Sequence, residues 1–177
     1  GYGKVYDLKK IGQPQTSYVI KTFNQKSSST SLKTIAEELT TFKVAPSHPH
    51  MVSFYGAFKK RDNTWVLVFE KLQKDLVEVH RIYSILKLKH FLGPLRALRS
   101  LHRRNLIHRD IKPDNILWKV VTENSWKGPE RTPVLKLADY GLVGSSLANP
   151  KCKGTEDYVA PELYLMGSTW VKIFRDE

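Results

Sequence analysis

The sequence predicts an α+β fold in which a strand-rich part with one helix precedes a part that contains a second helix. Two observations support this prediction. Short strand-like segments bounded by turn residues fill much of the first 70 residues, and apolar residues recur at helical spacing near residues 32–42 and 85–102. With 177 residues, 41% of them hydrophobic, the chain has the size and apolar content of one domain with a core.

The first two strands are expected at residues 4–8 and 17–21. The segment between them, residues 9–16, contains Gly12 and Pro14 and is predicted to be a turn. The two strands would then form a hairpin that leads into Lys21.

A helix is expected after the serine cluster at residues 27–31. Its apolar residues recur three or four positions apart, which places them on one face: Leu32, Ile35, Ala36, Leu39 and Phe42. Pro46 and Pro49 end this helix. Residues 51–58 and 65–69 are then predicted to be strands around a polar turn.

The second half of the chain begins with another helix, predicted over residues 85–102. Gly93 and Pro94 interrupt its apolar pattern, so a kink or a restart of the helix is expected there. Residues 115–118 and 134–137 are predicted to be short strands. The polar stretch between them, residues 122–133, is expected to be a surface insertion.

The net charge of +12 suits an anionic partner, but the basic residues are scattered along the chain without interleaved aromatic residues. A nucleic-acid-binding module is therefore not expected. The longest apolar run, residues 65–69, has strand length, so no membrane span is expected. The single cysteine, Cys152, cannot form an internal disulfide, which favours a cytoplasmic or nuclear protein.

The most informative segment is His108-Arg109-Asp110-Ile111-Lys112-Pro113-Asp114-Asn115. Phosphoryl transfer requires that a hydroxyl is oriented, a metal is bound and phosphate charge is offset. Asp110, Asn115 and Lys112 are chemically suited to these three tasks. The alternative is a polar surface loop that contains these residue types by chance.

This segment resembles the catalytic loop of eukaryotic-type protein kinases, and four further family markers occur in the expected order. They are Gly3-Lys4-Val5 at the end of a glycine-rich loop, Val19-Ile20-Lys21, Asp139-Tyr140-Gly141 and Ala160-Pro161-Glu162. The resemblance implies a two-lobed fold, with a small antiparallel sheet lobe at residues 1–70 that lacks its first strand. Residues 71–177 would form an incomplete helical lobe.

The resemblance also implies catalytic roles for individual residues. Asp110 would orient the substrate hydroxyl and accept its proton, and Lys112 would neutralise the transferred phosphoryl group. Lys21 would contact ATP phosphates and pair with a glutamate of the first helix. Glu37 and Glu38 are both candidates for that partner; Glu38 is chosen because helical spacing puts it beside Phe42, at the edge of the apolar face.

Metal and nucleotide contacts follow from the same resemblance. Asn115 and Asp139 would hold Mg²⁺. The residues expected around ATP are Gly3, Val5, Val19, Lys21, Phe69, Glu70, Leu72, Asp75, Leu117 and Asp139. Of these, Val5, Val19 and Leu117 would sandwich the adenine and Asp75 would reach the ribose, although an exposed helix-capping acid is an alternative for Asp75. His108 is interpreted as packed core.

The predicted activity is transfer of the ATP γ-phosphate to Ser or Thr of a protein substrate, because Lys112 and the Gly154-Thr155 pair resemble Ser/Thr rather than Tyr kinases. The rival interpretations are a small-molecule phosphotransferase and a non-enzymatic scaffold or inhibitor. Because the glycine loop is incomplete and few residues follow Glu162, residues 1–177 alone are expected to be poorly active. Ser145 and Ser146 are candidate phosphorylation sites that could pair with Arg109.

Overall fold

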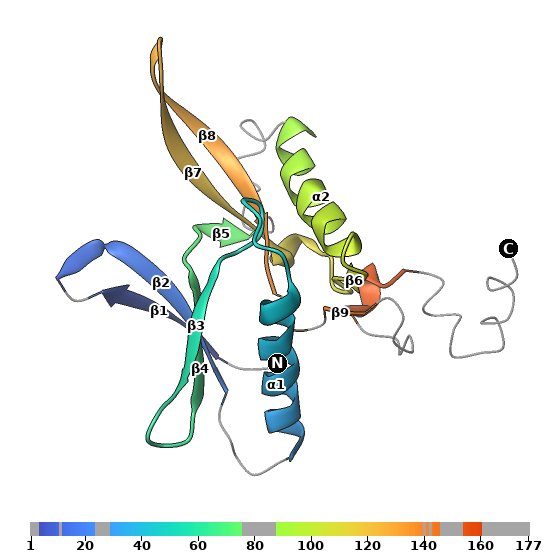
Figure 1. Ribbon diagram of the computed structural model, residues 1–177. Helices are drawn as coiled ribbons and strands as arrows, with labels where there is room; N and C mark the ends of the chain where they lie inside the picture. Colours follow the sequence, from blue (N-terminus) through green and yellow to red (C-terminus); the bar gives the residue numbers. More distant parts are fainter. Residues whose placement is uncertain are drawn as a thin grey trace, which may run out of the picture.

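The computed structural model describes residues 4–10, 12–23, 29–75, 88–139, 141, 143–145 and 154–160. Within them, an antiparallel sheet with one helix is followed by a second helix, a long hairpin and short strands (Figure 1). The α+β class predicted from the sequence is confirmed.

The first part of the chain forms a four-stranded antiparallel sheet in the order β1-β2-β4-β3. Its strands are β1 (Lys4–Lys10), β2 (Gln13–Phe23), β3 (Phe54–Lys59) and β4 (Trp65–Glu70). Helix α1 (Ser29–Val44) lies against this sheet (Figure 1). Its Ile35 is buried with Phe23 and Leu67, and Leu39 and Phe42 of the predicted apolar face pack against this cluster. Ala36, which was predicted on the same face, is exposed.

The predicted turn at residues 9–16 is wrong, because β1 continues to Lys10 and β2 begins at Gln13. Gly12 has a φ of 78°, which allows a tight reversal, and the register shifts between Lys9 and Lys10. The register pairs Lys9 with Ser17 and Lys10 with Gln13, so Pro14 lies in the irregular stretch between them, a common position for a proline within a sheet. The polar residues and the proline indicated a turn, so the sequence pattern did not predict that the hairpin continues to Lys10 and Gln13.

The third predicted strand also begins later than expected. Met51 forms only an isolated parallel bridge to Leu137, and β3 starts at Phe54. This bridge joins the two parts of the molecule, because Val52 N–H donates to the Leu137 carbonyl and Leu137 N–H donates to the His50 carbonyl, each at 2.9 Å. Backbone hydrogen bonds thus fix residues 50–52 against the second part.

The second part consists of α2 (Leu88–His102) and several strands. Strands β5 (Lys74–Asp75), β7 (Ile116–Ser125) and β8 (Gly128–Leu137) form a sheet in the order β5-β7-β8. Strands β6 (Leu106–Ile107) and β9 (Gly144–Ser145) form a separate pair. Two 3₁₀ turns, η2 (Pro113–Asn115) and η4 (Glu156–Tyr158), complete the described elements. Leu101, Leu137 and Ala97 are fully buried in the core between α2 and β8.

Helix α2 runs without a break through Gly93 and Pro94, so the helix does not restart there, and the alternative of a kink stays a prediction. Both residues are buried. A Cβ at Gly93 would lie 2.2 Å from Nδ1 of His50, so glycine allows the imidazole to pack against the helix backbone. The Gly-Pro pair therefore marks a close contact rather than an interruption.

The strands predicted at residues 115–118 and 134–137 are longer than expected, because the polar stretch between them forms the outer half of a hairpin with Thr122 paired to Arg131. The hairpin projects away from the rest of the molecule, and Trp126 at its tip is 90% exposed (Figure 1). Strand pairing uses backbone groups, so exposed residues can extend a hairpin without an apolar pattern. The stretch does lie at the surface, as predicted.

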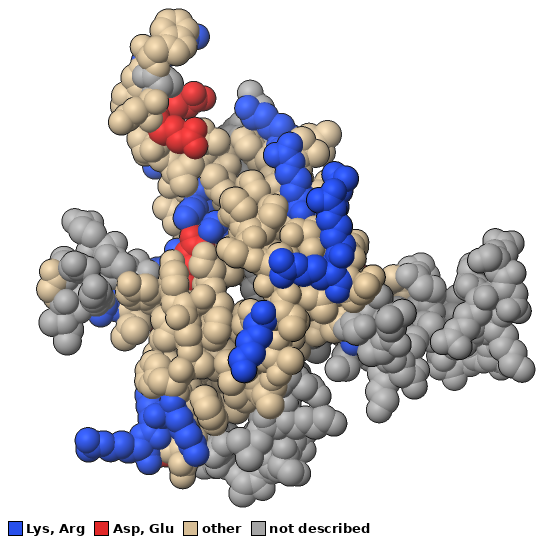
Figure 2. All heavy atoms as spheres, in the orientation of Figure 1, with Lys and Arg blue, Asp and Glu red and all other residues tan. Residues whose placement is uncertain are grey.

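Figure 2 shows Lys and Arg side chains gathered over α2, whose sequence contains no acidic residue. Within the described part of the chain, no helix has the length and hydropathy needed to cross a membrane.

Candidate functional site

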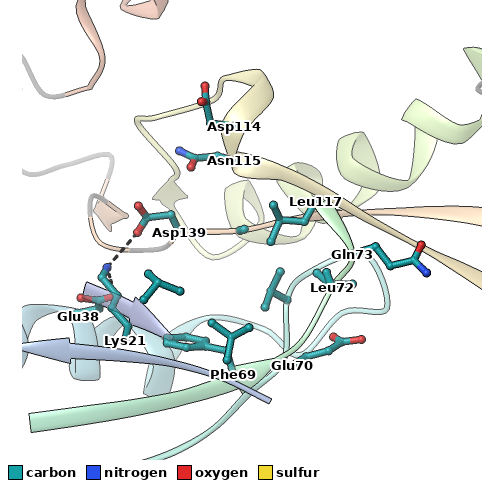
Figure 3. Close-up of a pocket in the computed structure, with 14 residues that line it drawn as sticks. Lys21, Glu38, Phe69, Glu70, Leu72, Gln73, Asp114, Asn115, Leu117 and Asp139 are labelled. Carbon is teal, nitrogen blue, oxygen red and sulfur yellow. Dashed lines mark hydrogen bonds and ion pairs between the residues drawn. The ribbon is translucent and has the colours of Figure 1, made fainter. Parts of the chain in front are cut away.

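A cleft of about 580 Å³ lies between the four-stranded sheet and the base of the β7–β8 hairpin (Figure 3). Most of the residues predicted around a nucleotide line it: Val5, Val19, Lys21, Phe69, Glu70, Leu72, Leu117 and Asp139. Glu38, the predicted partner of Lys21, and Asn115, a predicted metal ligand, line it as well. Its volume falls in the usual range for small-molecule sites, and a mostly apolar wall with few polar groups is typical of them.

One end of the cleft carries an ionic cluster around Lys21, which β2 places opposite Leu67 of β4. Its Nζ lies 2.9 Å from Glu38 Oε1 and 3.4 Å from Asp139 Oδ1 (Figure 3). The side chain of Glu38 is only 2% exposed. Burial raises the pKa of Glu38 above its usual value and outweighs the opposing effect of Lys21. The ion pair expected from helical spacing is present.

Asp139 adopts a φ of 56°, an uncommon conformation for a residue other than glycine. Its Oδ1 accepts a hydrogen bond from Gly141 N–H at 3.2 Å, which stabilises this turn. Arg109 has a φ of 69°. Asp139 and the two other described non-glycine residues with positive φ, both asparagines, are of types that tolerate this region, so Arg109 is the uncommon case. Backbone strain of this kind commonly accompanies functional sites.

The segment from His108 to Asn115 is held below the cleft by hydrogen bonds. His108 is buried, with Nε2 2.9 Å from the Ala138 carbonyl and Nδ1 accepting from Asp110 N–H at 3.3 Å. Nε2 must therefore carry the proton of a neutral imidazole, in agreement with burial, which lowers the pKa of His108. His108 is therefore packed in the interior, where it holds the backbone of Asp110 next to Ala138.

Asn115 is placed by the short η2 turn. Pro113 suits the start of such a turn because its φ is fixed. The Asn115 side-chain amide donates to the Asp110 carbonyl at 2.8 Å and to Asp110 Oδ2 at 2.9 Å. Ala138 N–H donates to the Asn115 carbonyl at 2.8 Å. This last bond joins the loop to the strand that leads into Asp139.

Asp110 is surrounded by hydrogen-bond donors. Its Oδ1 accepts from Thr155 N–H at 3.0 Å and from Thr155 Oγ1 at 2.8 Å, and Lys112 Nζ lies 3.4 Å from Oδ2. Burial raises the pKa of Asp110, but the bonds from Thr155 and Asn115 and the charge of Lys112 outweigh it, and the net pKa lies below the usual value. Asp110 is therefore a carboxylate at neutral pH.

The other end of the cleft is apolar. Val5 comes from β1 and Val19 from β2. Leu117 comes from β7 (Figure 3). Phe69 packs against Phe54, with ring centroids 5.5 Å apart, and Phe42 stacks on Phe54 at 4.1 Å. Phe69, Glu70 and Leu72 lie where the chain passes from the first part to the second. An apolar lining of this kind is typical of small-molecule sites.

Several predicted positions fall outside what the structure describes. Gly3, Tyr140, Cys152, Ser146 and the last two residues of the Ala160-Pro161-Glu162 marker lie outside the described residues. The side chains of Glu37, Asp75 and Ser145 do so as well, although the backbone of Asp75 pairs with Leu117. The guanidinium of Arg109 lies beside Gly144, where a Cβ would be 3.0 Å from its Cζ.

Sequence reasoning did not select four residues that line the cleft: Val52, Gln73, Asp114 and Ala138. Gln73 follows the selected Leu72, and Ala138 precedes the selected Asp139. This adjacency in sequence was the signal that could have identified them. Thr155 was noted only as a marker of specificity, yet it contacts both Asp110 and Lys112. Nothing in the sequence pattern indicated that Lys119 and Lys136 would contact Glu70.

The donor atoms suit Mg²⁺ bound together with phosphate. Asp139 supplies carboxylate oxygens and Asn115 an amide oxygen, the hard ligands that Mg²⁺ prefers. Among the described residues, no group of three or more His, Cys, Asp or Glu side chains could hold a metal alone. A site with one or two carboxylates completed by substrate oxygens and water is typical of Mg²⁺ in phosphoryl-transfer enzymes.

Comparison with known proteins identifies a family. A family model described as "Protein kinase domain" matches residues 1–170. The chain is 29% identical over 178 residues to the meiosis induction protein kinase IME2/SME1 of Saccharomyces cerevisiae, covering 92% of this chain and 28% of that protein. It is 29% identical over 188 residues to extracellular signal-regulated kinase 2 of Dictyostelium discoideum, covering 95% of this chain and 46% of that protein.

A further relative is the serine/threonine-protein kinase TAO3 of Xenopus laevis, 34% identical over 124 residues, which cover 67% of this chain and 12% of that protein. The chain spans less than half the length of each of these three relatives.

Proposed function

Because this chain belongs to the protein kinase domain family, we propose that its cleft binds ATP with Mg²⁺ and that the protein transfers the γ-phosphate to Ser or Thr hydroxyls of protein substrates. The observation that carries the proposal is the contact of Lys21 with both Glu38 and Asp139, which are 17 and 118 positions away in sequence. A cation held by two carboxylates at the end of an apolar cleft suits a nucleotide whose phosphates are bound with a metal.

Asp110 is proposed to orient the substrate hydroxyl and to accept its proton. Its lowered pKa keeps it as a hydrogen-bond acceptor at neutral pH. Thr155 and Asn115 hold its two oxygens by hydrogen bonds, which restricts rotation of the carboxylate. Positioning of this kind is the main contribution that a protein makes to phosphoryl transfer.

Lys112 and Lys21 are proposed to offset phosphate charge from the two sides of the cleft. Lys112 Nζ is held 2.7 Å from Thr155 Oγ1, close to the carboxylate of Asp110, where the transferred group would lie. Asn115 and Asp139 would hold the metal, which when bound neutralises charge on the phosphate oxygens. Val5, Val19 and Leu117 would enclose the adenine, and backbone groups of Glu70 and Leu72 would meet its polar edge. Gly3 and Asp75 remain proposed contacts to phosphate and ribose.

The division into lobes belongs to this proposal. We assign residues 1–70 to the sheet lobe and residues 71–177 to the helical lobe, with the cleft between them. The single cysteine favours the cytoplasm or nucleus as the place of action.

The test is phosphorylation of a protein substrate by the full-length protein, followed by phosphoamino-acid analysis. Phosphoserine or phosphothreonine is expected, and Asp110→Ala should lower kcat by about 10²- to 10⁴-fold. Glu123→Gln, an exposed carboxylate on the outer hairpin, is the matched control and should leave kcat unchanged. Predominant phosphotyrosine, phosphorylation of small molecules alone, or an Asp110→Ala variant as active as the parent would overturn the proposal.

A further inference from the structure

A second ionic cluster lies behind the adenine end of the cleft, around the side chain of Glu70. Glu70 is the last residue of β4, and its carboxylate points away from Lys21 and Asp139 (Figure 3). Its Oε1 lies 2.5 Å from Lys119 Nζ, and its Oε2 lies 2.6 Å from Lys136 Nζ. The Glu70 side chain is 10% exposed. The sheet part is therefore bonded to both strands of the hairpin.

The hairpin presents both lysines on the face that forms the floor of the cleft. Leu117 pairs directly with Lys136 across the two strands, so their side chains share a face. Lys119 follows Leu117 by two residues and lies on that same face. Leu117 lines the cleft below, and Phe69 and Leu72 line it beside Glu70. The contacts of Glu70 therefore join the connecting segment to the floor of the cleft through side chains, next to the backbone bond from Gln73 N–H to the Trp118 carbonyl.

The charges of this cluster are mutually dependent. One carboxylate serves two ammonium groups, and the side chain of Lys136 is only 8% exposed. Burial raises the pKa of Glu70, but hydrogen bonds from Lys119 and Lys136 outweigh it, so the pKa lies below the usual value. Loss of the carboxylate would leave two cations close together, one of them buried without a counter-ion, which is strongly unfavourable.

The next residue provides a natural comparison. Lys71 forms an ion pair with Asp7 of β1, but the Asp7 side chain is 65% exposed. Exposed pairs contribute little because water screens both charges. The connecting segment therefore carries two sets of ion pairs. The buried contacts of Glu70 can fix the distance between this segment and the hairpin, whereas the exposed pair of Lys71 and Asp7 cannot fix a distance.

We propose that Glu70, Lys119 and Lys136 are positioning residues that form an ionic clamp, which fixes the height of the cleft at its adenine end and so determines affinity for the nucleoside half of the nucleotide. This inference rests on the proposed ATP site. It assigns a function to three side chains that do not contact the phosphates or the metal.

The test measures dissociation constants for adenosine and for ATP with Mg²⁺, together with the melting temperature, in the full-length protein. Glu70→Gln should weaken both ligands by a similar factor, about tenfold, because the clamp acts on the part that they share. Lys136→Met should weaken both by a smaller factor, because Glu70 keeps Lys119. Asp7→Asn is the matched control and should leave both dissociation constants unchanged. Asp139→Asn should weaken ATP and spare adenosine.

A triple variant separates positioning from stability. Glu70→Gln, Lys119→Met and Lys136→Met together remove every charge of the cluster, and such replacements are often neutral for folding. We expect the melting temperature to recover while adenosine binding stays weak. The clamp proposal would be overturned if the triple variant recovered both its melting temperature and its affinity for adenosine. It would also be overturned if Lys136→Met and Glu70→Gln left adenosine binding unchanged. If the parent protein binds neither ligand, the proposed function fails first and the clamp fails with it.

Discussion

Lys112 Nζ lies 2.7 Å from Thr155 Oγ1, and that hydroxyl in turn donates to Asp110 Oδ1 at 2.8 Å. Residues 43 and 45 positions apart in sequence therefore share one hydrogen-bonded group with the proposed acceptor of the substrate proton. Substitution of Thr155 can therefore test how the proposed catalytic loop is held.

Replacing this hydroxyl by a methyl group, Thr155→Val, should lower kcat by about 10- to 100-fold. A hydrogen bond to a charged group contributes roughly 1.5–3 kcal/mol, and each 1.36 kcal/mol corresponds to about a tenfold change in rate. Thr155→Ser keeps the hydroxyl and should retain most of the activity. Steady-state kinetics on the parent and the two variants measures these kcat values. A Thr155→Val variant with the kcat of the parent would contradict the prediction.

Asp139→Asn should abolish the stabilisation by ATP that depends on Mg²⁺. A ligand present at 100 times its Kd adds about 2.7 kcal/mol to the free energy of unfolding, which thermal melting detects easily. The parent protein should show this shift with ATP and Mg²⁺ and a smaller one with ATP and a chelator. In Asp139→Asn the two shifts should be equal. A metal-dependent shift that survives the substitution would remove Asp139 from the metal site.

The raised pKa of Glu38 predicts how stability depends on pH. The folded state holds the Glu38 proton more tightly than the unfolded state, whose pKa is near 4.5, so this term is fully stabilising below pH 4.5. It is lost as pH rises through the folded-state pKa. The stability of the parent relative to Glu38→Gln should therefore fall as pH rises above 4.5.

Denaturant unfolding of both proteins at a series of pH values measures this difference. The other ionisable groups are shared by the two proteins, so their contributions largely cancel. A difference that grows with rising pH would mean that the pairing with Lys21 outweighs burial and that the pKa of Glu38 is lowered.

Gly93→Ala should destabilise the protein by about 1–3 kcal/mol, the usual cost of overpacking. The new Cβ would meet the ring of His50, which is held by its contact with the Leu135 carbonyl at 2.8 Å. In a helix without such a neighbour, the same substitution stabilises by up to about 1 kcal/mol. The sign should therefore reverse in a His50→Ala background, as measured by chemical unfolding. Destabilisation of equal size in both backgrounds would exclude the contact.

Residues 1–177 expressed alone should self-associate through the exposed leucines of α2. Leu88, Leu92 and Leu95 lie on one side of the helix, and Leu88 is 86% exposed. Contiguous exposed apolar patches commonly cause aggregation. Changing all three to Gln should reduce concentration-dependent light scattering, whereas Trp126→Gln, which removes an isolated exposed aromatic residue, should not. Equal effects of the two variants would refute this explanation.

The catalytic segment and the order of its companion markers could be recognised from sequence because each marker is a short run of consecutive residues. Local periodicity also selected Glu38 rather than Glu37, since the helix brings one of them to the edge of its apolar face. The same reasoning missed the strands that run through residues 9–16 and 122–133. There the strands are paired through backbone groups, so side-chain patterns carried no signal.

By itself, the sequence determined the fold class, the family and the residues proposed to carry the chemistry, because these depend on local patterns. Only the tertiary structure decided that His50 packs on Gly93, that Thr155 holds Asp110, and that Glu70 joins Lys119 and Lys136. These contacts link residues up to 66 positions apart. Their formation depends on how the sheet, α2 and the hairpin meet in space, and no spacing along the chain encodes that meeting.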